Sequence, residues 1–232
     1  MNEQSYCILV VNDDGPKSPL MVPFLDAIAA EPWCKELRVV LPAEEQSWIA
    51  KAVSRFRALK AQPTHLGRHS ALLVDGTPAD CTSLGINNLF PTPPDFVFSG
   101  INMGVNAGQA FLLSSGTVGG VVEASLYRVP GIAFSAHMPA QVFDSWRIHD
   151  ETALATYKED WTRLRVAAAP IASKLVFGWG SKLHDLITVN IPWLATPSTE
   201  LVPTSLTETH FKALFAEVAP GEYRHKFQGL ET

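Results

Sequence analysis

The feature that most constrains the fold of this chain is a short apolar run that stops abruptly at turn-forming residues. Residues 7–11 are all apolar, whereas residues 12–15 read Asn-Asp-Asp-Gly. The run is too short for a helix and is typical of a strand that is buried on both faces of a parallel sheet. Ligands of such sheets bind just beyond the carboxyl ends of the strands. Asp13 and Asp14 therefore mark either a site for a divalent cation or an ordinary Asp-Gly turn.

Further short apolar runs alternate with helical patterns along the chain. We expect additional strands at residues 37–41, 71–74, 96–98, 131–135 and 186–191. Helical patterns occur at residues 20–31, 78–89, 114–128 and 152–177, the last with a kink near Pro170. The alternation predicts an α/β fold with a mainly parallel sheet and helices on both faces. Because right-handed crossovers bring successive strand ends to one edge, the polar residues after several strands should converge there.

We expect residues 1–232 to form a single domain, since this length suits one domain with a substantial core. Residues 1–192 carry the α/β pattern. Within them, residues 50–64 mix basic and apolar side chains and are interpreted as an excursion or hairpin over the sheet edge. Residues 193–232 are rich in Pro, Thr and Glu and show weak periodicity, so an irregular segment is expected there.

The composition argues against several classes of partner. A net charge of −5 does not suit a large nucleic-acid surface or an anionic membrane surface, since both rely on basic patches. No apolar run is long enough to span a bilayer, and residues 1–5 lack the apolar core of a signal peptide. The three cysteines lie far apart and show no metal-binding or disulfide pattern. We therefore expect a cytoplasmic protein in a reducing compartment.

The polar residues after three of the predicted strands supply oxygen ligands. They are the carboxylates of Asp13 and Asp14, the hydroxyl of Ser47 and the amide oxygen of Asn102. Hard divalent cations such as Mg²⁺ prefer these ligands, and Mn²⁺ accepts them. Four protein ligands would leave about two octahedral positions for water and a substrate oxygen.

The Ser-Gly-Thr sequence at residues 115–117 can supply the donors that a phosphate needs. At a helix start it offers free backbone N–H groups, two hydroxyls and the favourable end of the helix dipole. The alternative is an ordinary N-cap at Ser115, followed by close helix packing at Gly119 and Gly120. Asn106 could orient phosphate or water, or could simply adopt a left-handed loop conformation.

Other chemistries find little support in the sequence. The chain contains no Gly-x-Ser-x-Gly elbow, Walker loop or dinucleotide-binding fingerprint, and its histidines show no metal-ligand spacing. His137 could reach the rim of the site, although a surface histidine is the commoner case. Trp48 and Phe111 could stack on a base or form local core. Lys51 and Arg55 could steer a phosphate or belong to a solvated face.

Several of these motifs, taken in order, resemble the hallmarks of a known family. They are Asn-Asp-Asp-Gly at 12–15, Gln-Ser at 46–47, Asp-Gly-Thr-Pro-Ala-Asp at 75–80, Ser-Gly-Ile-Asn at 99–102 with Gly104 and Asn106, and Ser-Ser-Gly-Thr at 114–117. With them, residues 6–137 resemble the survival protein SurE family, and residues 189–192 show a weaker likeness. Ser-Trp-Ile-Ala-Lys at 47–51 is similar to the eukaryotic, fungal-type branch, where glycine is usual in place of Ala50.

The resemblance implies a Rossmann-like three-layer α/β/α fold and a phosphoric monoester hydrolase. Its activity would be the release of phosphate from nucleoside 5′- or 3′-monophosphates with one divalent metal ion, Mg²⁺ or Mn²⁺. It places the metal ligands on Asp13, Asp14, Ser47 and Asn102. It places the phosphate contacts on Asn12, Asn106, Ser115, Gly116 and Thr117. We expect the catalytic residues to be Asp13, Asp14, Asn106 and Ser115, with Asp14 favoured as the group that orients or deprotonates the attacking water.

Besides Ala50, the resemblance has a second departure, at the C-terminal end. The family continues beyond the position of Thr232 with a closing strand and an arm that exchanges between subunits, so residues 193–232 are interpreted as a shortened segment. The alternative function is therefore a catalytically impaired protein that binds a nucleotide or a partner protein. By the same likeness we expect a homo-oligomer, at least a dimer.

Overall fold

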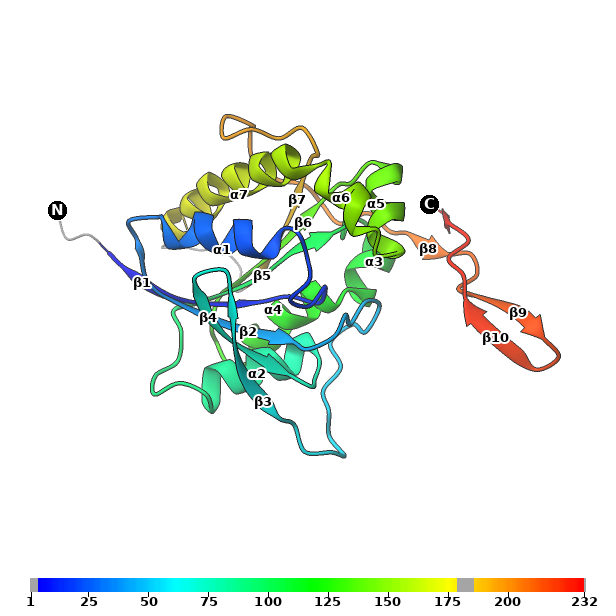
Figure 1. Cartoon of the computed structure of the whole chain (residues 1–232), viewed down its shortest axis with the longest axis horizontal. Coiled ribbons are helices and arrows are strands. Elements are labelled where there is room, and N and C mark those ends of the chain that lie inside the picture. Colours follow the sequence, from blue (N-terminus) through cyan, green and yellow to red (C-terminus); the bar gives the residue numbers. More distant parts are fainter. Residues whose placement is uncertain (1–3, 179–185, 232) are drawn as a thin grey trace.

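The computed structural model describes residues 4–178 and 186–231, and its middle layer is a seven-stranded sheet of order β3-β4-β2-β1-β5-β6-β7 (Figure 1). The strands are β1 (Tyr6–Val11), β2 (Cys34–Pro42), β3 (Ala61–Leu66), β4 (His69–Val74), β5 (Phe96–Met103), β6 (Gly131–Ala136) and β7 (Leu186–Ile191). Neighbouring strands are parallel except for β3 and β4, which pair antiparallel at one edge. The predicted α/β fold with a mainly parallel sheet is confirmed.

Helices cover both faces of this sheet and form the two outer layers. They are α1 (Met21–Ala29), α2 (Pro78–Asn87), α3 (Gln109–Ser114), α4 (Gly116–Leu126), α5 (Ala140–Arg147), α6 (Glu151–Ala155) and α7 (Lys158–Gly178). Figure 1 shows α1 and α7 on one side of the sheet and α2 and α4 on the other. The polar ends of several strands therefore remain open at one edge of a three-layer structure.

Strand β1 is apolar without interruption because the helices bury both of its faces. Ile8 and Val10 belong to the hydrophobic core that includes side chains of α1 and α7. Leu9 and Val11 belong to the opposite core, which includes side chains of α2 and α4. Successive side chains of a strand point to opposite faces, so each pair must find an apolar environment on its own side. This burial fixes the register of β1 and hence the position of the loop that follows it.

The C-terminal segment forms two short antiparallel pairs of strands outside the central sheet. Its strands are β8 (His210–Phe211), β9 (Phe215–Ala219), β10 (Glu222–His225) and β11 (Leu230–Glu231). Strand β9 pairs with β10, and β8 pairs with β11. The β9–β10 hairpin projects from the body of the molecule (Figure 1, red and orange). Some local order is thus present where the sequence pattern indicates an irregular segment.

The observed elements follow the sequence pattern closely but not everywhere. Residues 50–64 were expected to form an excursion or hairpin over the sheet edge. Residues 50–60 form no strand, and the hairpin at this edge begins only at Ala61, where β3 pairs with β4. The helical pattern at 152–177 is divided between α6 and α7, and Pro170 lies inside α7. The sequence did not predict the short helices α3 and α5. Among the described residues, no helix combines the length and apolar character that a membrane span requires.

Candidate active site

Asp13 and Asp14 lie in the loop that directly follows β1, and both side chains are 4% exposed. The amide of Asn12 closes this loop: its Nδ2 donates to the main-chain oxygen of Gly15 at 2.9 Å, and its Oδ1 accepts from the Gly15 N–H at 3.2 Å. Gly15 has a φ of 75°, a left-handed conformation that glycine adopts without strain. The Asp-Gly turn therefore exists, and it buries two carboxylates instead of leaving them in solvent.

The carboxylate of Asp13 is held by the first turn of α4. Its Oδ2 accepts from the main-chain N–H of Thr117 at 2.9 Å, and its Oδ1 accepts from the Thr117 hydroxyl. A side chain at Gly116 would not fit, since a Cβ there would lie 2.9 Å from the Asp13 Cβ. The first turn of α4 thus binds a carboxylate of the same chain, and Asp13 occupies both donors of Thr117.

Asp14 is anchored from the neighbouring strand. Its Oδ2 accepts from the main-chain N–H of Met103, at the end of β5, at 2.9 Å. Asn102, the residue before it, donates from Nδ2 to the main-chain oxygen of Gly104 at 2.8 Å. This bond turns the Asn102 amide so that its Oδ1 remains available as a ligand oxygen.

Burial shifts both carboxyl groups toward their protonated forms. Burial raises the pKa of Asp13 to about 6, although the hydrogen bonds from Thr117 lower it in part. Burial, together with the neighbouring Asp13 charge, raises the pKa of Asp14 well above its usual range. Two buried carboxylates with raised pKa values are characteristic of a site that a cation completes or that handles protons.

A pocket of about 860 Å³ opens over these carboxylates. Of the predicted site residues, those that line it are Asp13, Asp14, Ser47, Asn102 and Asn106. The other four, Asn12, Ser115, Gly116 and Thr117, are not among its lining residues. The strand ends therefore bring the four predicted ligands and Asn106 to one pocket, and the start of α4 supports it from behind Asp13.

The donor set suits a hard divalent cation. Asp13 and Asp14 supply the charge and Asn102 a free amide oxygen, while the Ser47 hydroxyl donates to Glu45 at 2.5 Å in this structure. Oxygen ligands of this kind match Mg²⁺ or Mn²⁺. Within residues 4–178 and 186–231, no group of three or more His, Cys, Asp or Glu side chains could hold a metal. A cation here would consequently depend on amide and hydroxyl oxygens as well as on the two carboxylates.

Asn106 is fixed by two residues that the sequence analysis did not predict. Its Nδ2 donates to the Ser135 hydroxyl at 2.8 Å, and its main-chain N–H donates to the Asn190 Oδ1 at 2.9 Å. Ser135 lies in β6 and Asn190 in β7, so the next two strands position this side chain. In the sequence, the only indication of these two residues is that each is a polar residue within an otherwise apolar strand. The second Nδ2 hydrogen of Asn106 remains free to donate into the pocket.

Ser115 is the N-cap of α4, because its hydroxyl oxygen accepts from the Val118 N–H at 3.1 Å. The close packing foreseen as the alternative is also present: a Cβ on Gly119 would lie 2.3 Å from the main-chain oxygen of Ala50. Capping and phosphate binding do not exclude each other, since the Ser115 hydroxyl hydrogen can still be donated.

Three interactions hold the loop after β2 against the loop after β1, the end of α3 and the helix α4. The Gln46 N–H donates to the main-chain oxygen of Asp13 at 2.7 Å, and the Ala50 N–H donates to that of Ser114 at 3.0 Å. Lys51 Nζ forms an ion pair with Glu123 Oε2 at 2.6 Å, and the Glu123 side chain is only 7% exposed. These bonds hold Ser47 at the pocket, and they give Lys51 a structural role.

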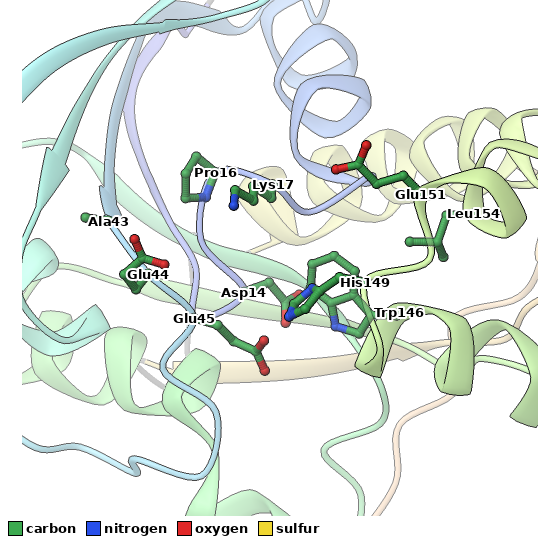
Figure 2. A pocket seen from close by; sticks show the side chains of 10 residues that line it. All are labelled: Asp14, Pro16, Lys17, Ala43, Glu44, Glu45, Trp146, His149, Glu151 and Leu154. Atoms are coloured by element: carbon green, nitrogen blue, oxygen red, sulfur yellow. The ribbon is translucent and has the colours of Figure 1, made fainter.

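A smaller hollow of about 180 Å³ adjoins the main pocket and shares Asp14, Glu45 and Trp146 with it. Figure 2 shows that its side chains come from the loops after β1 and β2 and from the α5–α6 region, including His149. The sequence does not predict this second hollow, because its far wall runs from Trp146 at the end of the unpredicted helix α5 to Leu154 in α6. His137, considered as a rim residue, does line the main pocket.

The sequence and the fold of this chain are similar to those of known proteins. The sequence profile of the family described as "Survival protein SurE" matches residues 8–214. A protein named 5′-nucleotidase SurE from Methanocella arvoryzae is 31% identical over 211 residues, covering 90% of this chain and 76% of that protein. Its namesake from Methanosarcina barkeri is 33% identical over 205 residues, covering 88% and 74%.

A solved structure shares the fold as well. The crystal structure of the SurE protein from Aquifex aeolicus superposes with a TM-score of 0.70 at 25% identity, covering 95% of this chain and 82% of that one. These relatives are archaeal and bacterial, so the likeness of residues 47–51 to the fungal-type branch stays a prediction.

The pH dependence of stability should report the raised pKa of Asp13. In the folded state this pKa is about 6, against 3.8 in an ordinary carboxyl group. Its contribution to folding is therefore fully present below pH 4 and is lost as the pH rises through 6. In the presence of a chelator, the melting temperature should fall between pH 5 and pH 7.5, and Asp13→Asn should flatten this decline. A wild-type melting temperature that rises over the same interval would contradict the assignment.

The Lys51–Glu123 pair gives a second prediction. Lys51→Met should lower the free energy of unfolding by about 1–3 kcal/mol, because it leaves a buried carboxylate without its partner. Urea unfolding measures the change, and Lys51→Met/Glu123→Met should recover part of the loss. Lys60→Met is the matched control, since Lys60 is exposed and no described residue forms an ion pair with it. Equal free energies of unfolding for Lys51→Met and Lys60→Met would show that the Lys51–Glu123 ion pair does not stabilise the protein.

Proposed function

Because this chain belongs to the survival protein SurE family, we propose that it is a phosphoric monoester hydrolase that releases phosphate from nucleoside monophosphates. The observation that carries the proposal is the pair of buried carboxylates, Asp13 and Asp14, at the floor of a pocket that also contains Asn102 and Asn106. Relatives that match about nine-tenths of the chain are named 5′-nucleotidase, which supports a nucleotide substrate. Activity toward 3′-monophosphates is proposed from the family likeness.

We propose a single divalent cation, Mg²⁺ or Mn²⁺, with Asp13, Asp14, Ser47 and Asn102 as its ligands. When bound, the cation supplies the charge that attracts the phosphate and makes a water molecule easier to ionise. Asp13 brings one negative charge, and Thr117 keeps its carboxylate in a fixed orientation with two hydrogen bonds. In this proposal Thr117 acts through Asp13, and Asn12 acts by closing the turn, so neither needs to reach the phosphate.

The remaining residues handle the water and the phosphoryl oxygens. Asp14 is held through Oδ2 by Met103, which leaves Oδ1 to orient the attacking water or accept its proton. The water oxygen attacks phosphorus while Asp14 accepts a water proton, the bond to the ester oxygen breaks, and the nucleoside leaves with that proton. The free Nδ2 hydrogen of Asn106, which lines the pocket, can donate to the phosphoryl oxygens. The family likeness adds the Ser115 hydroxyl and the Gly116 N–H, which follow the pocket-lining Ser114 in the chain.

The proposal is tested with phosphate release from adenosine 5′- and 3′-monophosphate, with Mg²⁺ or Mn²⁺ and then with excess chelator. Turnover that depends on the added cation supports it. Full activity after exhaustive chelation would contradict the metal role. Tight nucleotide binding by calorimetry without any phosphate release would favour the alternative of a non-catalytic nucleotide-binding protein.

Asp14→Asn and Ser115→Ala should lose activity in different ways. Asp14→Asn keeps the side-chain shape but removes a charge, so both metal affinity and turnover should collapse. Ser115→Ala removes one phosphate hydrogen bond worth about 1.5–3 kcal/mol, which is roughly a 10- to 150-fold loss of kcat/KM with metal affinity nearly unchanged.

Two controls separate these effects from folding. Glu44→Gln removes an exposed acid near the site, and Ser125→Ala removes a hydroxyl further along α4. Ser115→Ala also removes the N-cap, so its melting temperature is measured alongside activity. If both site variants keep wild-type kinetics, the strand-end cluster is only a turn and a helix cap.

We also propose that the protein associates as a homo-oligomer, at least a dimer. The β9–β10 hairpin exposes Phe215, Val218 and Tyr223 by 60%, 53% and 63%, which is unfavourable in a free monomer. Light scattering at micromolar concentration should give at least twice the chain mass of 25.3 kDa. A stable monomer under these conditions would overturn the prediction.

A further inference from the structure

Glu45 lies where the main pocket and the smaller hollow meet. It lines both cavities, and Figure 2 shows Glu45 and Asp14 reaching the hollow from the loops after β2 and β1. No cationic side chain of the described residues forms an ion pair with Glu45. A third carboxylate without a cationic partner is therefore present at the edge of the site.

The Glu45 carboxylate is occupied by one of the predicted metal ligands. Its Oε1 accepts a hydrogen bond from the Ser47 hydroxyl at 2.5 Å. This O···O distance is at the short end of the range for hydroxyl donors to carboxylates, and such bonds are roughly twice as strong as neutral ones. A serine hydroxyl carries one hydrogen and two lone pairs, and it rotates unless a partner fixes it. Because the hydrogen points to Glu45, both lone pairs of the Ser47 oxygen are left for other contacts.

This bond has a counterpart at the other neutral ligand. The Asn102 amide donates from Nδ2 to the main-chain oxygen of Gly104, which leaves its Oδ1 as the ligand atom. The Ser47 hydroxyl donates to Glu45, which leaves its oxygen as the ligand atom. Hydrogen bonds of this kind orient metal ligands and raise their basicity. A neutral hydroxyl benefits most, since its hydrogen would otherwise be free to point at the cation.

The backbone holds Glu45 and Ser47 at a fixed place beside Asp13. Gln46, the residue between them, donates its N–H to the main-chain oxygen of Asp13 at 2.7 Å. Burial is the main cause of the raised pKa of Asp13 and of Asp14, and the negative charge of Glu45 adds to the rise in both. Glu45 is thus near enough to the two carboxylates for its charge to act on the same cation.

A direct metal ligand is the first alternative role for Glu45. Within the described part of the chain, no three His, Cys, Asp or Glu side chains are placed to hold a metal, so Glu45 does not join Asp13 and Asp14 as a third carboxylate ligand. The second alternative is an ordinary surface acid. Glu44 represents that case, because it is exposed, precedes Glu45 in the chain and lines the hollow but not the main pocket.

We propose that Glu45 is a positioning residue of the cation site and acts through Ser47. It holds the Ser47 hydroxyl hydrogen away from the cation, so that the Ser47 oxygen is presented as a ligand. This inference rests on the proposed function, because it concerns how the same divalent cation is held. It extends the site by one residue that does not itself touch the cation or the substrate.

Calorimetric titration of the metal-free protein with Mn²⁺ tests the proposal without turnover. Glu45→Ala should weaken Mn²⁺ binding about 10- to 100-fold, the usual effect of removing such a partner of a metal ligand. Glu45→Gln keeps an acceptor oxygen for Ser47 and should stay within about fivefold of the wild type, since it loses only an exposed charge. Glu44→Ala is the matched control and should bind Mn²⁺ like the wild type. Equal losses in Glu45→Ala and Glu45→Gln would overturn the positioning role.

A double-mutant cycle shows whether Glu45 acts through Ser47. In a Ser47→Ala protein, adding Glu45→Ala should weaken Mn²⁺ binding by no more than about fivefold, because only the effect of the charge remains. The same 10- to 100-fold loss in both backgrounds would show that Glu45 acts independently of Ser47 and would overturn the proposal. Melting temperatures of the metal-free variants establish that each protein is folded.

The same measurements separate this proposal from the proposed function. If Mn²⁺ binds with the expected coupling but adenosine 5′-monophosphate is not hydrolysed, the hydrolase function fails and the role of Glu45 stands. If turnover depends on Mn²⁺ but Glu45→Ala binds it as tightly as Glu44→Ala does, the role of Glu45 fails and the function stands. A wild-type protein that binds no Mn²⁺ or Mg²⁺ would overturn both.

Discussion

The site depends above all on the contact between the Asp13 carboxylate and the first turn of α4. It joins the end of β1, whose position the two hydrophobic cores fix, to a helix start whose free N–H groups favour negative charge. Through its main-chain oxygen, Asp13 also receives the Gln46 N–H and so orients the loop that carries Ser47. One residue thus aligns three segments that are far apart in the sequence.

The position of Asp14 follows from this arrangement. The Asp13 carboxylate is hydrogen-bonded to the first turn of α4. The Asp14 carboxylate points instead toward β5, where it accepts a hydrogen bond from the Met103 N–H. Among the residues that the structure describes, neither carboxylate has a cationic side chain as a hydrogen-bond partner, and burial raises both pKa values. Burying two carboxylates without a cationic partner lowers the stability of the folded protein. A bound divalent cation would offset this destabilisation, and in the proposed function the same two carboxylates hold the cation and orient the attacking water.

The sequence predicted the parts of the fold that depend on strong local patterns. The run at 7–11 could be identified as a doubly buried strand because apolar residues on both faces leave no other explanation. The helices α3 and α5 are short and acquire their positions from tertiary contacts, so no periodicity marked them. The candidate ligands converge at one pocket, as the strand order predicts. The sequence could not show that both the N–H and the hydroxyl of Thr117 donate to Asp13. Nor could it show that Asn190 and Ser135 accept hydrogen bonds from Asn106. Which donor bonds to which acceptor depends on distances that only the folded chain defines.

The central claim is that Asp13 and Asp14 are the charged half of a divalent-cation site. Anomalous diffraction from crystals of the protein equilibrated with Mn²⁺ tests it most directly, because it locates the ion without any assumption about catalysis. One strong peak is expected about 2–2.3 Å from oxygens of Asp13 and Asp14, with the Asn102 amide oxygen among the remaining ligands. A strong peak elsewhere on the molecule, together with none between these two carboxylates at millimolar Mn²⁺, would contradict it.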